Sequence, residues 1–290
     1  MSDVHVVIPT HLPRYLEFVL IGLARQTLRA SSVVVSCDTD DPAIGGVIES
    51  WAPRLGMEVW WVRREHQGSE RLCQVRNNGV RHLRDVLGVD AGRLLILDGD
   101  MVLADDAIGL HASMGRNAEL VYPYRVDVSA EMTASLDVER VLSGAQQLEV
   151  DERARAALAR RAARYRRHRL LRTMKLGPLH KPKLLGGHFS CALALYLELN
   201  GFDELYQGWG FKDDEFAYRA ARRGARVQVA VEQIIGWHLF HQTRQPEVPM
   251  RELPMGRRFA QRASLPVVAA HGVERPLEQP EPRATLFPGR

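Results

Sequence analysis

The sequence predicts an α/β fold, a Rossmann-like, doubly wound and mostly parallel sheet within a single domain. Strand-like and helix-like segments alternate along the first half of the chain, which is typical of parallel strands joined by helices. Polar side chains follow the strands directly, at Thr10, Asp38 and Asp98. Because ligands of such sheets bind beyond the carboxyl ends of the strands, we expect a ligand site there. A chain of 290 residues can fill the core that this fold needs.

The predicted elements follow from apolar spacing and turn residues. Leu16, Val19, Leu20 and Leu23 recur at helical spacing and predict the first helix. The expected strands cover residues 4–8, 32–37, 57–62 and 94–97, and the expected helices cover residues 14–26, 44–51 and 72–86. Compact structure is expected to resume at residue 184, with a helix at 216–223 that ends at Gly224 and one late strand at 227–237.

Residues 131–171 have a helical pattern and are strongly basic. Two interpretations stay open for residues 153–172, which are rich in arginine: a solvated helix that leaves the core, or a patch that meets an anionic acceptor or anionic lipid. After residue 245 the chain contains eight prolines, and this tail is expected to be extended unless it packs on the body.

Charge and cysteine content limit the partners and the compartment. The net charge of +4 favours anionic partners such as phosphates and is too small to indicate nucleic acid. Cys37, Cys73 and Cys191 lack CxxC spacing and are expected to be reduced, buried thiols of a cytoplasmic protein. Without a signal-peptide pattern or an apolar run of about 20 residues, any membrane contact is expected to be peripheral.

The most informative motif is Asp98-Gly99-Asp100, directly after a buried strand. Gly99 lets the backbone turn tightly, and two carboxylates this close repel one another unless a cation lies near them. Oxygen ligands suit Mn²⁺ or Mg²⁺, and such an ion can clamp a diphosphate. The alternative is an ordinary turn, since Asp and Gly are both turn residues.

His238 and His241 follow the last expected strand and are candidate ligands of the same ion. Imidazole suits Mn²⁺ better than Mg²⁺, and their spacing can bring both rings to one ion if the chain bends. His241 is favoured because the chain is expected to leave the sheet there. The alternative for either ring is a packed histidine.

A second acidic cluster, Asp213-Asp214-Glu215, follows Trp209 and its two flanking glycines. Transfer of a group to a hydroxyl needs a carboxylate that accepts the proton, and all three acids are candidates for this base, with Asp213 and Asp214 ahead of Glu215. The alternative is that all three acids cap the next helix. Trp209 suits a lid or a platform on which a sugar ring stacks.

Weaker candidates surround these motifs, and a structural role is equally open for each. Asp38 can accept the imide N–H of a uracil, and Arg14 and Arg76 can bind a phosphate. Gly187 and His188 lie in a Gly-Gly segment that allows close approach of a ligand to the backbone.

Together these motifs resemble the GT-A fold glycosyltransferases, specifically the family-2-like enzymes and the β-1,4-galactosyltransferase and chondroitin-polymerase relatives. The similar stretches are Val7-Ile8-Pro9-Thr10, Val75-Arg76-Asn77-Asn78-Gly79 and the block from Gly186 through Asn200-Gly201-Phe202-Asp203-Glu204 to Gly210. The resemblance implies that Asp98 contacts the nucleotide, that Asp100, His241 and His238 bind the metal, and that Asp213 is the catalytic base. It also implies nucleotide contacts for Pro9, Thr10 and Asp38.

Lys212 stands where this family usually has a Glu that helps to hold the acceptor sugar. Lys212 is therefore expected to contact the acceptor, as are Gly187, His188 and Trp209, and the change from Glu indicates an unusual acceptor. The implied activity is inverting, metal-dependent transfer from a UDP-sugar to a carbohydrate, lipid-linked or small-molecule acceptor. The chain then divides into a nucleotide-sugar-binding half at 1–125, a basic helical excursion at 126–183, an acceptor-binding and catalytic half at 184–244, and the tail at 245–290.

Two other functions stay open. A nucleotidyltransferase usually has a glycine-rich loop after its first strand, whereas residues 9–13 contain no glycine. A non-catalytic sugar- or anion-binding protein would use the Arg-rich segment as its working surface, and Lys212 gives that hypothesis some support.

Overall fold

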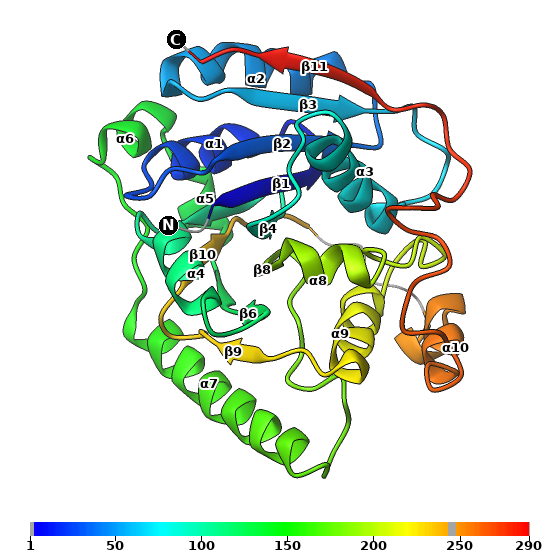
Figure 1. Ribbon diagram of the computed structural model, residues 1–290. Helices are drawn as coiled ribbons and strands as arrows, with labels where there is room; N and C mark the ends of the chain where they lie inside the picture. Colours follow the sequence, from blue (N-terminus) through cyan, green and yellow to red (C-terminus); the bar gives the residue numbers. More distant parts are fainter. Residues whose placement is uncertain (1–2, 243–247, 290) are drawn as a thin grey trace.

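The computed structural model describes residues 3–242 and 248–289 as an eight-stranded mixed sheet covered by helices on both faces, with a smaller three-stranded sheet beside it (Figure 1). The large sheet has the order β11 (Arg283–Phe287), β3 (Val59–Arg63), β2 (Ser32–Cys37), β1 (Val4–Thr10), β4 (Arg93–Leu97), β8 (His188–Ala192), β6 (Leu120–Tyr122) and β9 (Val227–Val229). The helices are α1 (Leu16–Ala24), α2 (Pro42–Leu55), α3 (Leu72–Asp85), α4 (Ala107–Gly115), α5 (Ala130–Ala134), α6 (Val138–Ser143), α7 (Glu152–Thr173), α8 (Leu193–Glu198), α9 (Lys212–Arg223) and α10 (Pro254–Ala260).

The four neighbouring strands β3, β2, β1 and β4 are parallel, which confirms the predicted α/β class. β8 and β11 run antiparallel to their neighbours and make the sheet mixed. Because β1 pairs with β2 on one side and with β4 on the other, the direction of strand succession reverses between β1 and β4. In open α/β sheets such a reversal marks the crevice at which ligands bind.

Alternate side chains of the central strands fill two separate cores. Val6 and Ile8 of β1 pack with α1, α2 and α4 on one face, whereas Val7 packs with α3 and the later helices on the other. All three side chains are fully buried, as expected for a strand with helices on both faces. This platform fixes the positions of the residues that follow β1 and β4.

The expectation of one late strand at 227–237 is wrong. The chain forms β9, turns at Ala230, whose carbonyl accepts a hydrogen bond from the Ile234 N–H at 3.0 Å, and then forms β10 (Ile235–His238). β10 is the middle strand of the small sheet, between β5 (Met101–Leu103) and β7 (Tyr124–Asp127). Residues 229–235 are mostly apolar and contain neither Gly nor Pro, so no turn signal separates the two strands in the sequence.

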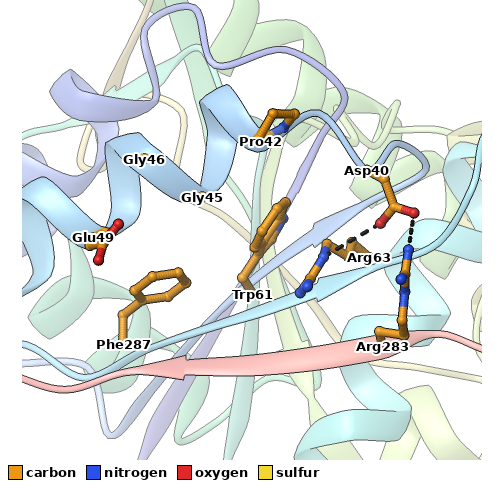
Figure 2. A pocket seen from close by; sticks show the side chains of 9 residues that line it. All are labelled: Asp40, Pro42, Gly45, Gly46, Glu49, Trp61, Arg63, Arg283 and Phe287. Carbon is orange, nitrogen blue, oxygen red and sulfur yellow. Dashed lines mark hydrogen bonds and ion pairs between the residues drawn. The ribbon is translucent and has the colours of Figure 1, made fainter.

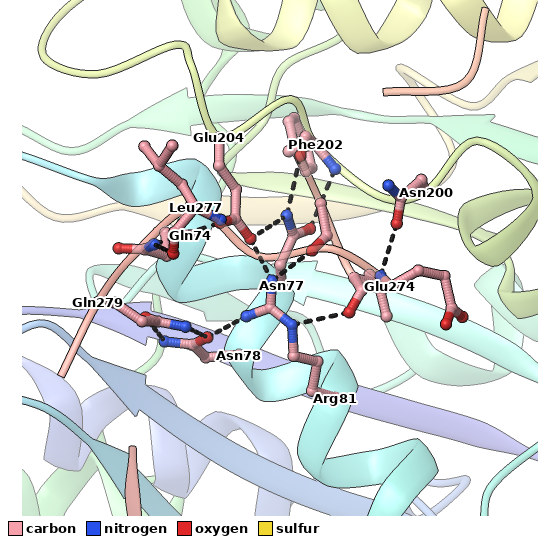
Figure 3. A network of polar contacts seen from close by, with 12 residues as sticks. Gln74, Asn77, Asn78, Arg81, Asn200, Phe202, Glu204, Glu274, Leu277 and Gln279 are labelled. Carbon is pink, nitrogen blue, oxygen red and sulfur yellow. Dashed lines mark hydrogen bonds and ion pairs between the residues drawn. The ribbon is translucent and has the colours of Figure 1, made fainter. Parts of the chain in front are cut away.

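The C-terminal segment packs on the body, with β11 as an edge strand on β3. A network of buried polar contacts joins α3, residues 200–204 and this segment (Figure 3). At its centre the Glu204 carboxylate accepts hydrogen bonds from Asn77 Nδ2 at 2.9 Å and from the Leu277 N–H at 2.7 Å, and it pairs with Arg81. The block 200–204 therefore has a structural role in positioning α3 and the tail.

Replacing Glu204 with Gln should lower the free energy of unfolding by about 3–5 kcal/mol, because Arg81 would lose the carboxylate that balances its charge. Urea denaturation measures the change. Glu198→Gln is the matched control, since Glu198 forms its ion pair with Arg223 at the surface and should contribute far less. Similar losses for both variants would contradict the importance of the network.

α7 lies along one edge of the molecule (Figure 1). Its buried side chains, Leu158, Ala162 and Tyr165, pack on Val126 of β7 and Val229 of β9. The three cysteines are buried. Within the described residues, no helix combines the length and the apolar character that crossing a bilayer requires.

Candidate active site

The ends of β1 and β4 touch at the crevice. A Cβ on Gly99 would lie 2.7 Å from Thr10 Oγ1, so only glycine allows this approach. The Gly99 N–H also donates a hydrogen bond to the Pro9 carbonyl at 3.3 Å. Pro9 and Thr10 therefore lie directly beside the Asp98-Gly99-Asp100 motif, as the sequence predicts for residues of one site.

Asp100, His238 and His241 converge, with one potential ligand atom of each within 4.8 Å of the others. Asp100 Oδ2 lies 3.0 Å from His241 Nε2 and 3.5 Å from His238 Nε2. The small sheet produces this arrangement, because β10 pairs His238 with Met101, the residue that follows Asp100. Both expected histidines, rather than one, reach the acid.

Asp127 is a functional candidate that the sequence analysis missed. Its Oδ1 lies 3.1 Å from His238 Nδ1, the ring nitrogen that faces away from Asp100. A carboxylate on the far nitrogen fixes the orientation of a ligating imidazole. No motif signals this residue, since it reaches His238 only through the pairing of β7 with β10.

The charges of this cluster are strongly coupled. Burial lowers the pKa of His238, but hydrogen bonds to Asp100 and Asp127 outweigh it and raise the pKa to about 9. Burial raises the pKa of Asp100, and the hydrogen bond and charge of His238 outweigh it, so the net shift is downward. One carboxylate and two imidazoles form a donor set that fits Mn²⁺ or a similar ion better than Mg²⁺.

A second cluster joins Asp98 to Asp213 through Arg76. Arg76 Nη1 lies 2.9 Å from Asp213 Oδ1, and Nη2 lies 3.4 Å from Asp98 Oδ1. Burial lowers the pKa of Arg76, but the two carboxylates outweigh it and raise the pKa. Burial, together with the charges of Asp100 and Asp213, raises the pKa of Asp98 to about 6 against the opposing effect of Arg76.

The expectation that Arg76 binds a phosphate is corrected by its position. The side chain is 1% exposed and lies over the ring of Phe202, with both terminal nitrogens bound to carboxylates. The neighbouring residues of α3 are buried in the core as well, so the role of Arg76 is to hold the two carboxylates in place.

Gly186 and Gly187 separate the two carboxylates. A Cβ on Gly186 would overlap Asp213 Oδ1, and one on Gly187 would lie 2.5 Å from Asp98 Oδ2. The Gly187 carbonyl also accepts a hydrogen bond from the Asp98 N–H at 2.9 Å. The absence of a side chain at both positions therefore lets Asp213 and Asp98 pack directly against this segment. The expected approach of a ligand to the Gly187 backbone stays a prediction.

His188 does not face the crevice, and the expectation that it contacts a sugar is wrong. It is fully buried in β8, where its Nε2 lies 3.0 Å from His111 Nε2. Burial lowers the pKa of His188 to about 3 and holds the pKa of His111 well below its usual value. The residue after the two glycines points into the core because side chains alternate along a strand.

This buried pair makes stability depend on pH. Because the folded state binds these protons more weakly than the unfolded chain, stability is complete above pH 6.5 and falls as the pH drops from 6.5 towards 3. The slope should reach about 1.4 kcal/mol per pH unit for each histidine. Urea denaturation between pH 7 and pH 4 should show a shallower dependence for His188→Gln, and parallel curves would contradict this account.

The acids of the second motif have different environments. Asp213 is 30% exposed, whereas the 10% exposed carboxylate of Asp214 lies between Lys181 and Lys183, each at 3.7 Å. Glu215 is buried and pairs with Arg219 at 2.5 Å. Helix α9 begins at residue 212, four positions before the expected start, and the acids lie in its first turn.

Lys212 is also positioned differently from the expectation of an acceptor contact. It is 7% exposed, and its ammonium donates to the Gly208 carbonyl at 2.8 Å and pairs with Glu70. The lysine thus joins the Trp209 loop to residue 70. Trp209 itself is 47% exposed, which leaves its ring available to a ligand.

Two outer candidates flank the crevice. Asp38, after β2, is 5% exposed, and its Oδ2 lies 3.3 Å from His66 Nδ1. Arg14 is exposed and its guanidinium lies 4.8 Å from the Tyr15 ring centroid, while the Tyr15 hydroxyl donates to the Phe240 carbonyl at 2.8 Å. Tyr15 thereby ties the start of α1 to the segment between the two histidines.

A pocket of about 430 Å³ lies apart from these clusters, between α2, β3 and β11 (Figure 2). Trp61 and Phe287 line it, and Arg63 and Arg283 both pair with Asp40 at one side. None of the residues in the two acidic clusters lines this pocket.

One segment of the chain matches a known protein family. Residues 167–242 match the family model described as the N-terminal domain of galactosyltransferase. The matched segment contains the glycine pair, Asp213 and both histidines of the metal cluster. No curated protein sequence gives a significant match.

Solved structures with a similar fold include TarS 1–349 of S. aureus in complex with UDP-GlcNAc, at 13% identity over 83% of this chain and 60% of that chain, with a TM-score of 0.53. Another is GalNAc-T7 with UDP, GalNAc and Mn²⁺, at 16% identity over 91% of this chain and 48% of that chain, with a TM-score of 0.59. This chain thus spans roughly half the length of the structures it matches. The chain has the GT-A glycosyltransferase fold, and its residues 167–242 are similar to the N-terminal domain of galactosyltransferase.

Proposed function

We propose that this protein is an inverting, metal-dependent glycosyltransferase that moves a sugar from a UDP-sugar to an acceptor hydroxyl. The strongest support is that one short turn contributes a carboxylate to each of the two clusters. Asp100 meets two histidines on one side, and Asp98 is joined through Arg76 to Asp213 on the other. Similar structures contain UDP-GlcNAc, or UDP with Mn²⁺.

Asp100, His238 and His241 would hold the ion, with Asp127 orienting His238. When bound, a divalent ion supplies positive charge that stabilises a departing diphosphate. Asp38 and Thr10, at the ends of neighbouring strands, would contact the nucleoside. Because hydrogen bonds to Asp100 and Asp127 raise the pKa of His238 to about 9, an ion that binds there would have to displace a proton from this ring.

Asp213 would act as the general base. Arg76 binds its Oδ1, which fixes the carboxylate and leaves Oδ2 to accept the proton of the acceptor hydroxyl. The hydroxyl oxygen then forms a bond to the anomeric carbon as the bond from that carbon to the diphosphate breaks, and the configuration inverts. Trp209 and the Gly186-Gly187 backbone would line the acceptor side, and Asp214 remains paired with its lysines.

A thermal-shift panel of nucleotides with and without Mn²⁺ tests this function. UDP and one UDP-sugar should raise the melting temperature by several degrees in the presence of Mn²⁺ only, since a ligand specific to the folded state stabilises it. Incubation with donor and acceptor should release UDP. A shift caused by nucleoside triphosphates alone, with release of pyrophosphate, would contradict the proposal and indicate a nucleotidyltransferase.

A further inference from the structure

Charge is distributed very unevenly along this chain. Residues 153–183 contain twelve Lys and Arg and no Asp or Glu. The rest of the chain contains 27 of the 39 basic residues and all 35 acidic residues, so it is acidic overall. The small net charge is therefore the sum of a strongly basic segment and an acidic remainder. Such segregation creates a local positive potential that the overall charge of +4 does not suggest.

Most basic side chains of α7 are exposed to solvent. The buried stripe of the helix consists of small or apolar side chains and Tyr165, and of the arginines only Arg161 and Arg172 are half-buried. Arg164, Arg167 and Arg169 are all exposed. Across residues 3–242 and 248–289, Arg166 is the one basic residue of α7 with an acidic partner, Glu232 at 3.0 Å. The positive charge is therefore mostly uncompensated.

The same end of α7 exposes large aliphatic side chains. Leu170 is 59% exposed, Met174 57% and Leu176 55%. Leu170 and Met174 are one helical turn apart and share a face, and Lys175 is exposed between Met174 and Leu176. Figure 1 shows this end of α7 and the turn after it at an extremity of the molecule. An apolar cluster surrounded by cations indicates a partner with both anionic and hydrocarbon parts.

We propose that the C-terminal end of α7 and the following turn, residues 164–176, dock on the surface of an anionic phospholipid bilayer. Arginines would contact the headgroup phosphates, and Leu170, Met174 and Leu176 would enter the interfacial region. Nucleic acid would satisfy the cations but offers no partner for three aliphatic side chains, since its affinity comes mainly from phosphate contacts. This proposal does not depend on the proposed catalytic activity.

The docking end is directly connected to the candidate active site. Gly186, which contacts Asp213, follows Leu176 by ten positions, so the two lie at most about 35 Å apart. A bilayer bound at α7 would thus bring membrane-borne molecules near the crevice.

Vesicle co-sedimentation of the full chain tests this inference, with phosphatidylcholine vesicles compared with vesicles that also contain phosphatidylglycerol. The protein should bind the anionic vesicles and dissociate at high salt. The variant R164Q/R167Q/R169Q should bind on the order of 100-fold more weakly. The variant L170S/M174S should bind at least about tenfold more weakly. The matched control R116Q/R226Q/R257Q removes three exposed arginines elsewhere and should bind like the parent.

Melting temperatures establish that each variant is folded. Absence of binding to anionic vesicles would overturn the proposal, as would an equal loss in the control variant. Binding of a homopolymeric RNA that L170S/M174S leaves unchanged, together with unchanged vesicle binding by that variant, would assign the surface to a polyanion instead.

Discussion

Asp213→Asn should lower the rate of sugar transfer by about 10²–10⁴-fold while UDP binds with nearly the affinity of the parent protein. The substitution keeps an oxygen that can accept the hydrogen bond from Arg76 Nη1, so the bridge to Asp98 should survive. It removes the negative charge and with it the ability to take a proton. Released UDP measures the rate, and isothermal titration calorimetry with Mn²⁺ and UDP measures binding.

The neighbouring acid provides the comparison for this prediction. Asp214→Asn makes the same chemical change one residue away, at a carboxylate held between Lys181 and Lys183, and it should reduce the rate far less. Retained turnover in Asp213→Asn would remove Asp213 from the role of base. A reversed order of the two variants would assign the role to Asp214.

Asp100→Ala should abolish the Mn²⁺-dependent binding of UDP and with it all measurable transfer. Asp100 supplies the one carboxylate of the metal cluster, and the two imidazoles are too few to hold a divalent ion firmly by themselves. The affinity of the parent protein for Mn²⁺ should rise with pH up to about 9, because the ion competes with the proton of His238. Titration of Mn²⁺ into each protein by calorimetry checks both statements.

Asp127→Asn tests the group that orients one proposed metal ligand, and His168→Ala is its control. Asp127→Asn alters only the group behind His238 and should weaken Mn²⁺ binding by about 10–100-fold. His168 lies on α7, away from the cluster, and its replacement should leave Mn²⁺ binding unchanged. If Asp100→Ala binds Mn²⁺ and UDP like the parent, the ion is held elsewhere.

Much of the fold could be predicted because its signals are local. Each central strand is a short apolar run, and each ends at a polar residue that identifies the edge of the sheet, such as Asp98. The switch from β9 to β10 escaped prediction because the turn at Ala230 consists of residues that also suit a strand. The pairing of β11 with β3 joins residues more than 200 positions apart, and no local pattern encodes such a contact.

Candidate site residues could be predicted where acids or imidazoles lie close together in the sequence. Asp98, Asp100, Asp213 and the two histidines are recognisable because each lies in a short motif of acids or imidazoles. Side-chain direction was not predictable in the same way. His188 follows Gly187 by one residue, yet strand alternation turns it into the core beside His111.

Arg76 and Lys212 show a related limit. Both are cations next to recognisable motifs, and both were expected to meet a ligand. Each is instead bound to acids that come from distant parts of the sequence, Arg76 to Asp98 and Asp213, and Lys212 to Glu70. A partner more than 100 residues away leaves no signal near the residue itself.

The most direct test of the central claim is a crystal structure of the protein with Mn²⁺ and UDP, in which anomalous scattering locates the manganese. We expect manganese coordinated by Asp100, His238 and His241 and by the UDP diphosphate, with Asp213 facing the space beyond the diphosphate. Manganese bound away from Asp100, or a diphosphate on the side of the molecule remote from Asp213, would contradict the account.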